Sequence, residues 1–202
     1  MFSALSNSYC QGIFVILRNI GMSIPRVMKK VTASLLEWAS RDRGRQNLIR
    51  ISVSIEPVLH KKLFRELTTD ELYELLRVRS EVFVVEQNCV YQDMDGDDQQ
   101  SIHLWMTNEN SIVALARVCP AGTHMNEISI GRVITTERGK GYGKQIMLYA
   151  IDAAIEFFDA KCIDIEAQEY AKGFYESVGF KQSSDTFMLD GIPHIKMTWI
   201  KE

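Results

Sequence analysis

The sequence predicts a mixed α/β fold, in which strands and helices of one domain share a core. Runs of β-branched and apolar residues with period two alternate with segments whose apolar residues recur at helical spacing. A glycine-rich turn joins one such strand directly to a helix. The length of 202 residues fits one domain with a sizeable core and an appendage.

The first half of the predicted domain contains a strand, two helical segments and a hairpin. Leu63–Leu67 is the candidate first strand. Thr68 and Glu71 have the spacing of a capping box, in which two side chains satisfy free N–H groups at a helix start. A second helical segment is expected at Val82–Gln87. After an acidic loop, alternating residues predict the two hairpin strands, Ser101–Met106 and Ser111–Val118.

The second half alternates strands and helices. Ile128–Thr135 is rich in β-branched residues and predicts the strand that enters the glycine-rich turn. Gly179 suits the left-handed position after a helix. The predicted order is therefore β-α-α-β-β-β-α-β-α-β-β, and its remaining members are helix Lys144–Phe158, strand Cys162–Ala167, helix Tyr170–Val178 and strands Ser184–Leu189 and His194–Ile200.

The glycine-rich turn, Arg138–Lys144, predicts an anion site. Glycines at 139, 141 and 143 alternate with Lys140 and Tyr142 at the start of a helix. The N–H groups that begin a helix lack partners and lie at the positive end of its dipole, which suits a diphosphate. A glycine-rich strand-turn-helix joint without a ligand is the alternative interpretation.

Two common phosphate-binding patterns do not fit this turn. A P-loop requires serine or threonine after its lysine, but Gln145 follows Lys144. The dinucleotide pattern requires a third glycine where Lys144 stands. The remaining pattern, R-x-x-G-x-G, places Arg138, Gly141 and Gly143 in register and resembles the acetyl-CoA pyrophosphate loop of the GNAT N-acetyltransferases.

Other stretches are similar to the ElaA-type branch of that family, over roughly residues 60–202. The link from Arg132 to Arg138 is about two residues shorter than is usual in the branch, and Leu189 stands where an acidic residue is common. The stretches that carry the resemblance are Arg79–Cys89, Asp95-Gly96, His103-Leu104, Ala167-Gln168, Phe174-Tyr175, Gly179-Phe180 and Asp190–His194.

The resemblance implies a GNAT acyl-CoA N-acyltransferase fold with acetyl-CoA as the acetyl donor. The strand before the glycine loop would be splayed from its neighbour, with its free backbone groups holding the pantetheine arm. Gly131 then marks either a bulge in that strand or a site of close packing. The cofactor-binding residues implied in this way are Val133, Ile134, Arg138, Gly139, Lys140, Gly141, Tyr142, Gly143 and Lys144.

Acetyl transfer to an amine also requires an acid for the leaving thiolate and a base for the amine. The resemblance implies that Tyr175 is the acid, and proton donation of this kind is worth about 10²–10⁴ in rate. The alternative is a core tyrosine, because Tyr175 lies on an apolar helical stripe.

Glu86 is the candidate base, since it follows an apolar run where partial burial would favour proton uptake; local pairing is its alternative. Asp95 and His194 are weaker candidates for contacting the substrate. His103 is expected to be structural, on the face of its strand opposite Leu104.

The acidic loop Tyr91–Asp98 is expected to be solvated and to attract a cationic substrate. As a calcium loop it fails, because Leu104 stands where the twelfth ligand should be glutamate, and we predict no metal. Residues 1–50 carry a net charge of +6, so the chain total of −3 leaves −9 for residues 51–202. The acidic domain favours a small-molecule or peptide amine as acceptor and excludes nucleic acid.

Residues 1–58 are expected to be a dispensable or poorly ordered basic extension, and residues 59–202 the GNAT domain. The run Gly12–Leu17 is too short to span a membrane, so no membrane partner is predicted. Cysteines without a C-x-x-C pair favour a reducing, cytoplasmic location. An organelle-targeting role for residues 1–58 is the alternative. A homodimer is compatible with the sequence.

Two other functions stay open. One is an acyltransferase resembling the acyl-homoserine-lactone synthases, which share a similar start at Arg79–Val84 but usually lack alternating glycines. The other is a GNAT module that binds acyl-CoA without turning it over, because fold does not establish function.

Overall fold

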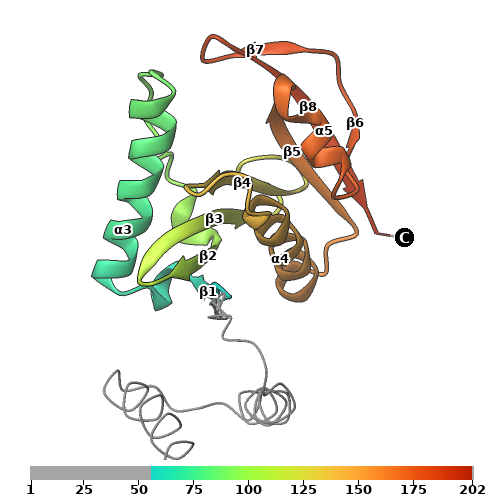
Figure 1. The fold of residues 1–202 in the computed structure, drawn as a ribbon. Coiled ribbons are helices and arrows are strands. Elements are labelled where there is room, and N and C mark those ends of the chain that lie inside the picture. The colour runs from blue at the N-terminus through green and yellow to red at the C-terminus, as the bar shows by residue number, and fades with distance from the viewer. Residues whose placement is uncertain (1–55, 202) are drawn as a thin grey trace, which may run out of the picture. The chain divides into compact units, whose positions relative to one another are not determined.

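The computed structural model describes residues 56–201. The chain divides into two units, Met1–Val53 and Ser54–Glu202, and the described residues belong to the second. The expected N-terminal extension therefore lies outside the described residues except for positions 56–58. Figure 1 shows the elements of the described unit, which are β1 (Val58–Leu63), η1 (Phe64–Glu66), α3 (Thr69–Arg79), η2 (Ser80–Glu86), η3 (Asp98–Gln100), β2 (Ile102–Asn108), β3 (Ser111–Cys119), β4 (Ile128–Thr135), α4 (Tyr142–Phe158), β5 (Cys162–Gln168), η4 (Glu169–Ala171), α5 (Lys172–Glu176), β6 (Lys181–Gln182), β7 (Phe187–Leu189) and β8 (Ile192–Ile200).

The described strands form one mixed sheet. Their order is β1-β2-β3-β4-β5-β8-β6, and β7 pairs with β8. Neighbouring strands are antiparallel except β4 and β5, which are parallel. The mixed α/β class is confirmed, and the elements follow the predicted order except that the first two helical segments are continuous and β6 is an additional short strand.

Helices α3 and α4 cover opposite faces of the sheet. Leu75 of α3 belongs to a core cluster with Trp105 of β2. Met147 of α4 belongs to a larger cluster with the preceding strand residue, Leu104. Because successive side chains of a strand point to opposite faces, the two clusters lie on either side of the sheet.

The first strand was predicted in the wrong place. Strand β1 ends at Leu63, and Phe64–Glu66 forms a 3₁₀ turn. The Glu66 carboxylate accepts a hydrogen bond from the Leu63 backbone N–H at 3.0 Å, which stabilises the turn. The capping box at α3 is confirmed: the Thr68 hydroxyl accepts from the Glu71 N–H at 3.2 Å, and the Glu71 carboxylate accepts from the Thr68 N–H at 2.9 Å.

Two helices also differ from the prediction. The segment expected at Val82–Gln87 is not separate, because α3 continues through Ser80, whose backbone is helical, into the π-helical η2. The helix expected at Tyr170–Val178 is shorter: a 3₁₀ turn precedes α5, which ends at Glu176. Gly179 follows with φ +95°, the left-handed conformation expected after a helix.

Candidate active site

Strands β4 and β5 are adjacent only at their beginnings. Ile128 pairs with Ile163 and Ser129 with Asp164, and no later pair joins the two strands. Strand β5 remains paired with β8 as far as Gln168. Figure 1 shows β4 and β5 diverging from this point. The splay that the resemblance implied is therefore present, and it leaves backbone groups of β4 free of sheet pairing.

Strand β4 carries a bulge where the splay begins. Arg117 of β3 pairs with Gly131 and Leu115 pairs with Ile134, so β4 has one extra residue between the two pairs. Arg132 within this segment has φ +53°, a conformation that side chains rarely adopt. An added Cβ at Gly131 would meet no atom within 4 Å. Close packing does not explain this glycine, and the bulge alternative is the one observed.

A buried network of ion pairs holds the bulge. The Arg132 guanidinium lies 2.7 Å from an Asp93 oxygen and 2.9 Å from an Asp95 oxygen. Asp93 and Asp98 are only 4% and 5% exposed, whereas residues 94–96 are exposed, so the acidic loop is solvated only in part. The members of this cluster, which we call the Arg–Asp network, are Arg79, Arg117, Arg132, Asp93, Asp95 and Asp98.

The network lowers the pKa of two of its carboxylates, Asp95 and Asp98. Burial raises the pKa of Asp98, but the guanidinium groups of Arg79 and Arg117 outweigh it and hold that pKa below its usual value. The same balance, with Arg117 as the main partner, lowers the pKa of Asp95. Arg117 could have indicated this network from the sequence. It is a charged residue inside the apolar strand β3, and a buried charge requires buried partners of opposite charge.

A cavity of about 410 Å³ lies in the splay. The bulge contributes one wall and β5 contributes the facing wall. Side chains from α5, the β7–β8 turn and the loop after η2 complete the lining. The residues that matter below are Gly131, Arg132, Val133, Glu166, Gln168, Tyr175, Asp190 and His194, together with Cys89, Asp95, His124 and Tyr170.

Tyr175 lies in this cavity. Its ring makes edge contacts with Phe174 and Phe180, at centroid distances of 4.9 and 6.2 Å. Among the described residues, the Tyr175 hydroxyl has no hydrogen-bond partner, whereas its carbonyl accepts from the Val178 and Phe180 N–H groups at 3.1 Å. Burial, with a smaller contribution from Tyr170, raises the pKa of the phenol to about 12. The phenol is therefore protonated near neutral pH.

Glu86 lies elsewhere. Its side chain is 46% exposed and pairs with Arg138, and it does not line the cavity. Glu86 is exposed, so the expected partial burial is not observed, and its partner Arg138 lies 52 positions away in the chain, so the pairing is not local either.

The other predicted polar residues divide between the cavity and the core. His194 lines the cavity, with Nδ1 2.8 Å from the Ile192 carbonyl. Asp95 also lines it, but both carboxylate oxygens accept hydrogen bonds from Arg117. His103 is buried, and its Nε2 lies 3.1 Å from the Asp98 carbonyl, as expected of a structural histidine.

The glycine loop has the geometry of an anion site. Gly139 and Gly141 have φ of +78° and +80°, and α4 begins at Tyr142. Gln145 donates the first helical hydrogen bond, to the Gly141 carbonyl at 3.2 Å. The N–H groups of residues 142–144 therefore have no partner within the helix. A Cβ at Gly143 would lie 3.4 Å from Phe174 and Thr135, so this glycine serves close packing.

The basic side chains around this loop are partly neutralised. Arg138 pairs with Glu86 and Lys140 with Glu137. Lys144 is exposed and has no ion pair among residues 56–201. An incoming diphosphate would therefore compete with the carboxylates of Glu86 and Glu137 for Arg138 and Lys140, whereas Lys144 is free to bind it.

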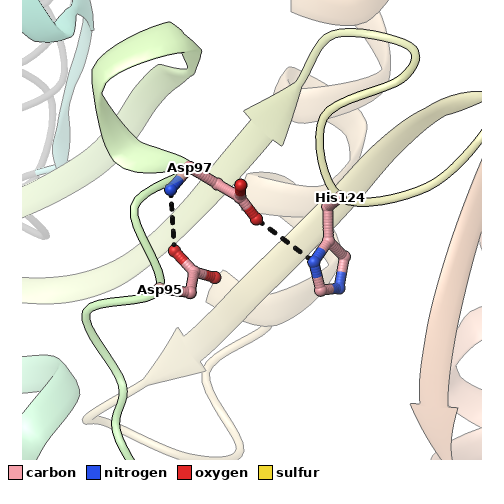
Figure 2. Close-up of side chains that lie close together, drawn as sticks. All are labelled: Asp95, Asp97 and His124. Atoms are coloured by element: carbon pink, nitrogen blue, oxygen red, sulfur yellow. Dashed lines mark hydrogen bonds and ion pairs between the residues drawn. The ribbon is translucent and has the colours of Figure 1, made fainter.

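Asp95, Asp97 and His124 form a cluster beside the cavity (Figure 2). One potential ligand atom from each lies within 4.8 Å of the others. The Asp95 carboxylate, however, is already neutralised by Arg117 and Arg132, whose positive charges oppose binding of a cation. The donor set suits an ion-pair network better than a metal site.

The helices among residues 56–201 include none that is both long and apolar enough to span a bilayer.

Comparisons with known proteins agree with this geometry. Residues 65–201 match the model of the acetyltransferase (GNAT) domain. A UPF0039 protein of Schizosaccharomyces pombe is 42% identical over 140 residues, which span 67% of this chain and 92% of that protein.

Two crystal structures are similar as well. That of Escherichia coli ElaA is 35% identical with a TM-score of 0.67, over 71% of this chain and 99% of its own. That of an acyl-CoA N-acyltransferase from Pseudomonas aeruginosa is 34% identical with a TM-score of 0.66, over 70% of this chain and 99% of its own.

Proposed function

The chain belongs to the GNAT acetyltransferase family and is related to the ElaA proteins, and from this premise we propose that it transfers an acetyl group from acetyl-CoA directly to a primary amine. One observation carries the proposal. A single cavity contains the bulged, unpaired part of β4, the free phenol of Tyr175 and carboxylates able to attract an amine. Direct transfer requires both substrates to meet in one such space.

The donor would bind across the N-terminus of α4 and along β4. The pyrophosphate would accept hydrogen bonds from the N–H groups of residues 142–144, at the positive end of the helix dipole. The pantetheine arm would pair with the backbone of Val133 and Ile134, which β5 leaves free. A backbone N–H of the bulge would then polarise the thioester carbonyl.

Tyr175 would protonate the departing thiolate. Its hydroxyl is not tied to the backbone, which favours a catalytic role over a purely structural one. Because burial raises its pKa to about 12, the phenol keeps its proton near neutral pH and can donate it as the thiolate departs, and the phenolate then takes a proton from the acetylated nitrogen.

The acceptor would enter from the side of the cavity formed by β5 and the β7–β8 turn. Glu166 and Asp190 supply negative charge there, and Tyr170 supplies an apolar surface. A primary amine is positively charged near neutral pH, so these carboxylates would attract it. Glu86 pairs with Arg138 outside the cavity, so the base is sought among residues that line it.

Thiol release from acetyl-CoA tests the proposal. The full chain would be assayed with putrescine, spermidine, L-lysine, an aminoglycoside and a short peptide with a free N-terminus. We expect thiol release that depends on at least one amine and on the chain. CoA binding without thiol release from any of them would favour a non-catalytic acyl-CoA-binding module, and a lactone product would indicate synthase chemistry.

A further inference from the structure

Glu166 is a carboxylate on the facing wall of the cavity whose charged contacts, with Lys196 and His124, are both as long as 3.9 Å. Strand β5 presents Asp164, Glu166 and Gln168 on one face, because its alternate residues are buried on the other. Asp164 accepts a hydrogen bond from Thr198 at 2.7 Å, and Gln168 donates one to Gln87 at 3.0 Å. Glu166 makes no hydrogen bond within the described part of the chain, and its side chain is 23% exposed.

His124 lies between Glu166 and a second carboxylate. Figure 2 shows His124 paired with Asp97. Its Nδ1 is 3.3 Å from an Asp97 oxygen, and its Nε2 is 3.9 Å from a Glu166 oxygen. The imidazole is 37% exposed, so it reaches solvent as well as the cavity. A carboxylate at Nδ1 favours a proton on that nitrogen and leaves Nε2 able to accept one.

We propose that Glu166, His124 and Asp97 form a proton exit path, in which Glu166 deprotonates the acceptor ammonium and His124 carries the proton to solvent. This inference rests on the proposed function. It names Glu166 as the catalytic base, His124 as the carrier and Asp97 as the residue that positions the imidazole. These residues come from three segments far apart in the chain, so the sequence alone did not indicate that they meet.

The proton balance of the reaction requires one such exit. The ammonium gives one proton to Glu166, and the nitrogen lone pair then forms a bond to the acetyl carbon. Collapse of the adduct breaks the carbon–sulfur bond, and Tyr175 protonates the thiolate. The second nitrogen proton returns to the Tyr175 phenolate. One amide, one thiol and one released proton result, and the released proton is the one that passes through His124.

The charges around this path are mixed. Asp95 and Asp97 lie beside His124 on the loop before η3, and Glu166 faces it from β5. Lys196 of β8 is 3.9 Å from Glu166, and Arg117 of β3 is 3.9 Å from Asp97. Arg132 contacts Asp95. Of these cations, Lys196 is the one paired with Glu166.

The test measures kcat/KM of the full-length chain for the panel amine that the wild type acetylates fastest, across pH. We expect His124→Asn to lower kcat/KM by about 10²-fold near neutral pH. The deficit should shrink as pH approaches the pKa of the amine, about 10, where the acceptor already has a free lone pair. Added imidazole should restore part of the rate, and CoA affinity should not change.

A double variant, compared with Glu166→Gln alone, and a matched control show whether Glu166 and His124 act in one path or independently. Because groups that act in series are not additive, the double variant His124→Asn with Glu166→Gln should lose no more rate than Glu166→Gln alone. The matched control is His60→Asn, which removes an imidazole of β1 that is hydrogen-bonded to Thr107 of β2 and should keep the wild-type pH profile.

The possible failures are distinguishable. If no panel amine is acetylated by the wild type, the proposed function fails and this inference with it. If the wild type is active, a His124→Asn variant with an unchanged rate overturns the path alone. A loss that is equal at every pH and does not respond to imidazole overturns it too, because it indicates a structural role.

Discussion

Tyr175 combines a packed ring with a free hydroxyl. The ring contacts Phe174 and Phe180, while the hydroxyl faces a cavity and has no partner among residues 56–201. The hydroxyl is not among the buried atoms that lack a hydrogen-bond partner, so its missing protein partner carries no burial cost and leaves it accessible. The arrangement favours a group held ready for proton donation.

Replacement of Tyr175 by phenylalanine tests this role. The ring is retained, so we expect the fold and CoA affinity to persist while kcat falls about 10²–10³-fold. Because the lost interaction exists only in the transition state, kcat/KM should fall equally and the KM for acetyl-CoA should change little. Steady-state kinetics and a thermal melt check this.

The matched control is Tyr73→Phe, which removes an exposed phenol on α3. It should leave both kcat and the melting temperature unchanged. Near-normal kcat for Tyr175→Phe together with a lowered melting temperature would show that the hydroxyl stabilises the fold and does not act in catalysis.

Single residues of the site differ in how far sequence reveals them. Tyr175 was found because it falls within a family pattern. Glu166 left a weaker signal, since the polar residues of β5 alternate with Ile163, Ile165 and Ala167. His124 left none, because a histidine in a polar loop shows its role only when its distant partners are known.

Three features together form the bulge in β4. The bulge follows Gly131, the left-handed Arg132 turns the strand, and the Arg–Asp network fixes the Arg132 side chain. A bulge often re-aims backbone groups next to an active site. Sequence analysis offered the bulge as one of two alternatives at Gly131, and the open space around this glycine distinguishes them.

The glycine loop makes a prediction at the same scale. Gly141→Glu places a carboxylate where the diphosphate is expected, at a position with φ +80°. We expect CoA binding to weaken by at least about tenfold, equivalent to about 1.4 kcal/mol, because like charges repel and the backbone is the ligand. Calorimetric titration with CoA checks this.

Gly122→Glu is the control for Gly141→Glu. Gly122 has nearly the same backbone angle, φ +77°, and also has open space around an added Cβ. The Gly122→Glu substitution therefore adds the same charge and strain in the β3–β4 loop, and the CoA affinity of this variant should equal that of the wild type. Equal CoA affinities for the two variants would exclude the loop as the pyrophosphate site.

Element bounds were predictable where a local pattern determines them. Strand β4 has the predicted bounds, because a β-branched run ends at a glycine turn. Strand β1 was misplaced because His60, Lys61 and Lys62 interrupt its apolar residues, and the segment becomes a strand by pairing with β2. That pairing is a long-range property, and local alternation does not reveal it.

Across the whole molecule, the Arg–Asp network connects α3, β3, β4 and the acidic loop. Asp98 accepts hydrogen bonds from both Arg79 and Arg117, at 2.7 and 2.9 Å. Removing it leaves two buried guanidinium groups with less compensation. We therefore expect Asp98→Ala to cost about 3–5 kcal/mol of unfolding free energy, measured by denaturant titration. Glu74→Ala, which breaks the exposed pair with Arg77, should leave the unfolding midpoint unchanged.

The pH dependence of stability gives an independent check on the network. Asp95 and Asp98 have lowered pKa values in the folded state, so the unfolded chain binds protons more readily. Their contribution is full above the unfolded pKa of about 4 and is lost as pH falls through the folded values. Wild-type melting temperatures should fall on acidification below about pH 4, and less steeply in Asp98→Ala. Identical slopes would contradict the buried pairing.

The fate of the acetyl group is the most direct measurement. Acetyl-CoA labelled in its acetyl group would be mixed with the full chain and the preferred panel amine, and protein and small molecules would be separated by mass. We expect the label in an amide of the amine, with an equal amount of free thiol and none on the protein. Label that remains on the protein, for example on Cys89 in the cavity, or that is released as acetate, would contradict direct transfer to an amine.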